Sequence, residues 1–137
     1  MRIAAVLATI VTSILIGQGQ AASSDRHVNV SLQPVDGSGV TGRVELTQLP
    51  KGGTQITIVA NGLEPGEEYL SLYYENHTCE LEPYEEDDVI GRYTANAAGV
   101  GTTTAKKGDD LDEINSVSVR RASDFALRAC ADVHPGN

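Results

Sequence analysis

The sequence predicts an all-β fold, an antiparallel β-sandwich or flattened barrel of about eight strands. Beyond the first 25 residues, apolar side chains recur at every second position, the period of a strand with one face in a core and the other in water. Short segments rich in Gly, Pro, Asn and Asp separate these runs at strand-length intervals. No long segment has the apolar spacing of a helix.

The expected strands follow one another along the chain. Alternating or apolar runs cover 28–32, 42–46, 56–60, 69–74, 117–120 and 126–133. Turn-forming segments lie between them at 36–39 (DGSG), 50–53 (PKGG), 61–66 (NGLEPG), 96–99 (NAAG) and 106–110 (KKGDD). The segment 109–115 has room for one helical turn. Two longer connections, CELEPYEEDD and GDDLDE, are acidic, and we expect both to be surface loops.

The N-terminus predicts export. Met1-Arg2 is followed by an apolar run from Ile3 to Ile16 and then by small residues, which is typical of a secretory signal peptide over 1–22. The run is short for a transmembrane span, although a retained anchor is the alternative. We therefore expect a secreted or periplasmic product, a single domain over 23–137, with no membrane span after the signal is removed.

The acidic balance restricts the partners. The chain carries 10 basic and 19 acidic residues, a formal net charge of −9, and removal of Arg2 leaves nine against nineteen, or −10. Such a surface repels nucleic acid and favours a cationic partner or a weakly bound divalent cation. The loop 80–88 offers carboxylates to calcium but lacks the spacing of an EF-hand.

Two cysteines, Cys79 and Cys130, are expected to form one disulfide in an oxidising compartment. Closing so long a loop would stabilise the fold by about 4 kcal/mol on chain-entropy grounds. Two free thiols, or a pair that binds metal, are the alternatives.

Several segments together resemble the copper/zinc superoxide dismutase family. They are, in order, the hairpin VNVSLQPVDGSGVTGRVELTQ, the turn and strand ITIVANGLEPGEEY, the segment VIGRYTANAAGVG and the C-terminal ALRACADV. The resemblance covers nearly all of 23–137. It implies an eight-stranded Greek-key sandwich and a bond between Cys79 and Cys130.

The metal ligands of that family do not carry over. Its two strand histidines fall on Ser71 and Tyr73, its late copper histidine on Arg120 and its zinc aspartate on Val89. The loop that supplies its other histidines is short here and contains none. Imidazole ligands in fixed geometry are needed for copper to cycle between redox states, so the resemblance implies degenerate metal positions. We expect the side chains of Ser71, Tyr73 and Arg120 to cluster where copper would lie.

The family's anion-attracting arginine is missing from its place as well. That arginine stands three residues before the second cysteine, where this chain has Leu127, and Arg128 follows one residue later. A shift of one residue turns a strand side chain to the opposite face unless a bulge corrects it.

We therefore expect a non-catalytic binding or structural domain without copper, zinc or another cofactor. A divergent dismutase or metal-handling protein is the first alternative, and an immunoglobulin-like adhesion module with a different strand order is the second. On 69–74, Leu70, Leu72 and Tyr74 share one face, which we expect in the core. Tyr69 and Tyr73 share the other face, and either pack on the sheet or point outward to a partner. The sequence leaves the ligand and the oligomeric state open.

Overall fold

The computed structural model describes residues 26–136, so the predicted signal peptide at 1–22 lies outside the described residues. Eight strands make up most of the fold: β1 (His27–Pro34), β2 (Thr41–Gln48), β3 (Thr54–Asn61), β4 (Glu68–Tyr74), β5 (Val89–Thr94), β6 (Gly101–Lys107), β7 (Ser116–Arg121) and β8 (Leu127–Asp132). Two short 3-10 helices, η2 (Glu86–Asp88) and η3 (Leu111–Glu113), stand in the acidic connections. The predicted helical turn within 109–115 is η3. No helix among residues 26–136 is long and apolar enough to cross a bilayer.

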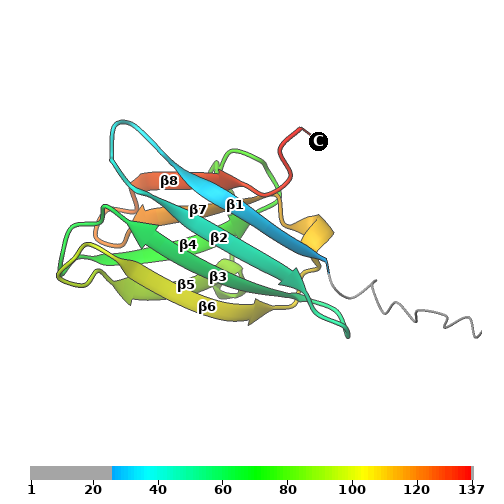
Figure 1. Ribbon diagram of the computed structural model, residues 1–137. Coiled ribbons are helices and arrows are strands. Elements are labelled where there is room, and N and C mark those ends of the chain that lie inside the picture. The colour runs from blue at the N-terminus through cyan, green and yellow to red at the C-terminus, as the bar shows by residue number, and fades with distance from the viewer. Residues whose placement is uncertain (1–25, 137) are drawn as a thin grey trace, which may run out of the picture.

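The strands form one antiparallel sheet that curls into a flattened, nearly closed barrel. Its order is β5-β4-β7-β8-β1-β2-β3-β6, and Figure 1 shows β1, β2, β3 and β6 in one layer with the other four behind them. The two end strands meet so closely that a Cβ on Gly91 of β5 would collide with Thr103 of β6. The predicted all-β flattened barrel of eight strands is confirmed.

The order of the strands is of the Greek-key type. From β4 the chain continues through β5 and β6. Strand β7 then returns to pair with β4 on the side opposite β5. An immunoglobulin-like sandwich instead places its second strand beside its fifth. Here β2 pairs with β1 and β3, so the immunoglobulin-like alternative is wrong.

Alternation along the strands builds the main core between the two layers. Val44 and Leu46 of β2 and Ile56 and Ile58 of β3 point inward and are fully buried, whereas their neighbours such as Arg43 face water. The apolar spacing of these strands therefore predicted their faces correctly. Leu111 of η3 is also fully buried in this core, at the end of the barrel where the acidic connections lie.

Strand β4 is buried on both faces, which corrects the expectation for its tyrosines. Tyr69 and Tyr73 are only 4% and 8% exposed and belong to the main core, so an outward tyrosine pair is wrong. Leu70 and Leu72 are buried as expected, but in a separate apolar cluster on the outer face of the sheet. That face is dry because the connection 75–88 folds back over it and brings Cys79 onto the cluster.

Candidate functional site

The residues matched to metal ligands do not come together. Ser71 and Tyr73 point into the barrel, where the Ser71 hydroxyl lies 2.7 Å from the hydroxyl of Tyr93. Burial raises the pKa of Tyr93 to about 12. Arg120 stands opposite Leu70 in the ladder between β4 and β7, so its side chain is on the outer face with Leu70. The prediction that Ser71, Tyr73 and Arg120 cluster is wrong.

One residue along β4 separates its inner face from its outer face. Because side chains alternate along a strand, a match that is wrong by one residue selects the opposite face. The residues of β4 that share the face of Arg120 are Leu70, Leu72 and Tyr74. Val89, the position matched to the zinc aspartate, lies in the same outer cluster and is 5% exposed.

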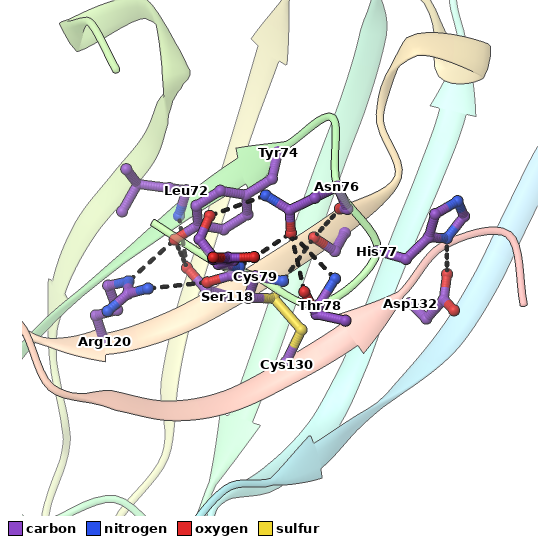
Figure 2. Close-up of a disulfide and its surroundings, with 12 residues drawn as sticks. Leu72, Tyr74, Asn76, His77, Thr78, Cys79, Ser118, Arg120, Cys130 and Asp132 are labelled. Atoms are coloured by element: carbon purple, nitrogen blue, oxygen red, sulfur yellow. Dashed lines mark hydrogen bonds and ion pairs between the residues drawn. A yellow bond between two sulfur atoms is a disulfide. The ribbon is translucent and has the colours of Figure 1, made fainter. Parts of the chain in front are cut away.

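Arg120 is the centre of a buried polar network on this face (Figure 2). Arg120 is only 7% exposed. Nε donates to the hydroxyl of Tyr74 at 3.0 Å, and the two terminal nitrogens donate to the carbonyls of Phe125 and Cys79, each at 2.9 Å. The guanidinium also lies over the Phe125 ring, 5.2 Å from its centroid. Among residues 26–136, no carboxylate forms an ion pair with Arg120.

The two carbonyls that Arg120 binds belong to residues in an unusual backbone conformation. Cys79 has φ +57° and Phe125 has φ +63°, in the left-handed region that residues other than glycine rarely adopt. Such a conformation costs roughly 1 kcal/mol or more at each residue and persists where its surroundings fix it. One guanidinium therefore fixes both the connection 75–88 and the turn between β7 and β8.

The disulfide fixes the same connection to β8. Cys79 and Cys130 are bonded, with Cα atoms 6.0 Å apart, and the predicted pairing is confirmed. The alternatives of free thiols or a metal-binding pair are therefore wrong. The amide of Cys79 donates to Ser116 Oγ of β7 at 3.1 Å, so this residue is held from three sides.

This face does not fit copper. The side chains that a cation would meet here are Leu70, Leu72, Tyr74 and Arg120, which offer no imidazole and already include a permanent positive charge. The three histidines have separate hydrogen-bond partners: His27 bonds to Thr47, His77 to Asp132, and His134 to the carbonyl of Leu111. Within 26–136, no three His, Cys, Asp or Glu side chains are placed to hold a metal ion, the loop 80–88 included.

Two adjoining hollows lie between the connection 75–88 and the end of β6, and we call them together the acidic groove. Its acidic lining consists of Glu75, Glu82, Glu85, Asp87, Asp88 and Asp109. Tyr73 reaches its floor from the core and donates to the Asp87 carbonyl at 3.4 Å. Burial, and then the carboxylates of Asp109, Asp88 and Asp87, raise the pKa of this hydroxyl, which stays neutral. Lys106 and Lys107 also line the groove, as does Tyr84, which is 41% exposed.

Arg128 does not take the place of the missing arginine. Val119 pairs with Ala129 and Arg120 with Leu127, so Arg128 is the extra residue of a β-bulge. Leu127 packs on the outer cluster beside Arg120. Arg128 instead lines a hollow near Tyr69, away from the outer cluster.

Comparison with known proteins adds no relative. A scan against protein-family models gives no match, and a search of curated proteins gives none either.

Proposed function

We propose that this protein is an exported, non-catalytic domain of the copper/zinc superoxide dismutase type that binds a cationic partner through the acidic groove. Arg120 carries the proposal. The residue matched to the family's late copper histidine is a permanent cation that already binds two carbonyls and a hydroxyl. The Greek-key order of the strands and the link between Cys79 and Cys130 support the ancestry.

Loss of the metal site removes a redox role but keeps the scaffold. The Arg120 guanidinium is now part of the fold, because it links β7 to the connection 75–88 and to the turn 122–126. The acidic groove is lined by six carboxylates against two lysines, Lys106 and Lys107. A basic segment of a protein or peptide is the partner that this charge favours.

The metal question has a direct test. The exported domain is purified, incubated with copper and zinc, dialysed and assayed for bound metal and for superoxide removal. We expect less than one bound copper per chain. We also expect no more superoxide removal than free copper gives at the same residual concentration. One copper per chain, with superoxide removal abolished by a chelator, would refute the non-catalytic proposal.

The binding question is tested with a basic probe. A fluorescent hexalysine peptide is titrated with the protein at low salt, and with a variant in which Asp88 and Asp109 become Asn. We expect the variant to bind at least about tenfold more weakly, and binding to weaken with salt, because both carboxylates line the groove. A variant with both Glu45→Gln and Asp36→Asn, two exposed acids outside the groove, is the matched control for the loss of two charges. Equal weakening by the control would mean that net charge, and not the groove, attracts the probe.

A further inference from the structure

A second hollow, of about 330 Å³, lies at the other end of the barrel from η3, and we call it the arginine groove. It is lined chiefly by Ser38, Val40, Glu64, Tyr69, Arg121 and Arg128. The turn between β1 and β2, the loop between β3 and β4, and the bulge at the start of β8 meet there. It shares no lining residue with the acidic groove.

Arg128 lines this groove, and its guanidinium has no partner among residues 26–136. Three arginines, Arg26, Arg92 and Arg121, form ion pairs with carboxylates, and Arg120 donates to carbonyls. The Arg128 side chain is partly buried, yet within the described residues its guanidinium makes no hydrogen bond or ion pair. A bulge commonly re-aims one side chain, and here it directs this one into a hollow.

Two further donors face the same space. The Tyr69 oxygen accepts from the amide of Glu64 at 2.9 Å, and its own O–H finds no acceptor within 26–136 although the residue is only 4% exposed. Arg121 gives Nε and one terminal nitrogen to Asp124, which leaves its other terminal nitrogen free. Buried donors are normally paired, so the buried Tyr69 hydroxyl, beside two arginines with unused N–H groups, indicates a ligand that supplies an acceptor.

We propose that the arginine groove binds a carboxylate group, with the planar fork of Arg128 as its main contact and the Tyr69 hydroxyl as a second donor. A carboxylate matches the guanidinium fork with two parallel hydrogen bonds. Glu64 in the lining, and Glu67 close to Arg121, disfavour ligands with two or more negative charges such as phosphate. This binding site is independent of the acidic groove and of the cationic partner proposed for it.

The probes are N-acetylalanine, its amide N-acetylalaninamide, and acetate, each titrated into the ¹⁵N-labelled protein with the disulfide intact. We expect saturable shifts of the amides around Tyr69 and Arg128 with N-acetylalanine and none with the amide, which has the same shape without the charge. Saturation by acetate at equal concentration would identify any small acid as the ligand. A clear preference for N-acetylalanine would identify the end of a peptide.

Variants separate the site from general charge. Arg128→Gln is expected to weaken N-acetylalanine binding about tenfold or more, and Arg128→Lys to weaken it less, since a charge is retained without the fork. Arg43→Gln, an exposed arginine of β2, is the matched control and should leave binding unchanged. Spectra of each variant without ligand verify the fold. Equal binding of the acid and its amide, or unchanged affinity in Arg128→Gln, would overturn the proposal.

Discussion

Replacement of Arg120 should strongly destabilise the outer face. In Arg120→Met the bulk of the side chain is kept, but the carbonyls of Cys79 and Phe125 lose donors that lie at 2.9 Å. Each buried acceptor left without a partner costs roughly 1 to 3 kcal/mol. Tyr74 is affected less because its hydroxyl also lies 2.9 Å from Ser118 Oγ. We therefore expect a loss of about 4 kcal/mol in the free energy of unfolding.

The assay is urea unfolding with the disulfide intact, analysed from the midpoint and the slope. Arg92→Met is the control, because Arg92 pairs with Glu86 at 2.8 Å but both side chains are largely exposed, at 47% and 76%. Such a surface pair is worth about 1 kcal/mol or less. Arg120→Lys is a second variant, which keeps the charge but cannot reach the same acceptors with a planar fork.

The ranking of the three variants decides the reasoning. We expect Arg120→Met to be the least stable, Arg120→Lys to recover only part of the loss, and Arg92→Met to be close to the original protein. A loss below about 1 kcal/mol in Arg120→Met would refute the claim that the guanidinium holds the two left-handed residues in place.

Two further predictions concern the disulfide and the titration of Asp124. Replacing both Cys79 and Cys130 by Ser should lower the free energy of unfolding by about 4 kcal/mol, measured by urea unfolding, since the bond closes a separation of 51 residues; an unchanged midpoint would contradict it. Hydrogen bonds from Arg121 and the Ala126 amide lower the pKa of Asp124 to about 2. Its stabilising contribution should be present above the ordinary pKa of about 3.9 and be lost as the pH falls through about 2. An NMR titration checks this, and in Arg121→Gln the pKa should move back toward its ordinary value.

The sequence predicted those features that follow from local pattern. Strands such as β2 and β3 alternate cleanly because one face meets the core and the other meets water, so period two identifies both the strand and its faces. The turn η3 lies within 109–115, the segment predicted to have room for one helical turn. The pairing of Cys79 with Cys130 was predicted because the chain has two cysteines.

Features that depend on a distant segment were not predictable in the same way. The two faces of β4 are both apolar enough to be buried, and only the path of 75–88 decides that Leu70 and Leu72 are covered from outside. The partners of Arg120 are chiefly backbone carbonyls, which every residue carries and no sequence pattern reveals. The bulge at Arg128 is likewise set by the pairing of β7 with β8, so the direction of its side chain could not be read from its position relative to Cys130.

Arg120 accounts for how the connection 75–88 is held on the outer face. The connection 75–88 has few apolar side chains of its own and must be held by specific contacts. The disulfide and the hydrogen bond from the Cys79 amide to Ser116 Oγ hold this residue from two sides. Arg120 supplies the directional part, because its fork binds the Cys79 carbonyl and the Phe125 carbonyl at once and so fixes the loop and the turn relative to β7. A metal could not take this role, because it would require ligands that Leu70 and Leu72 do not provide.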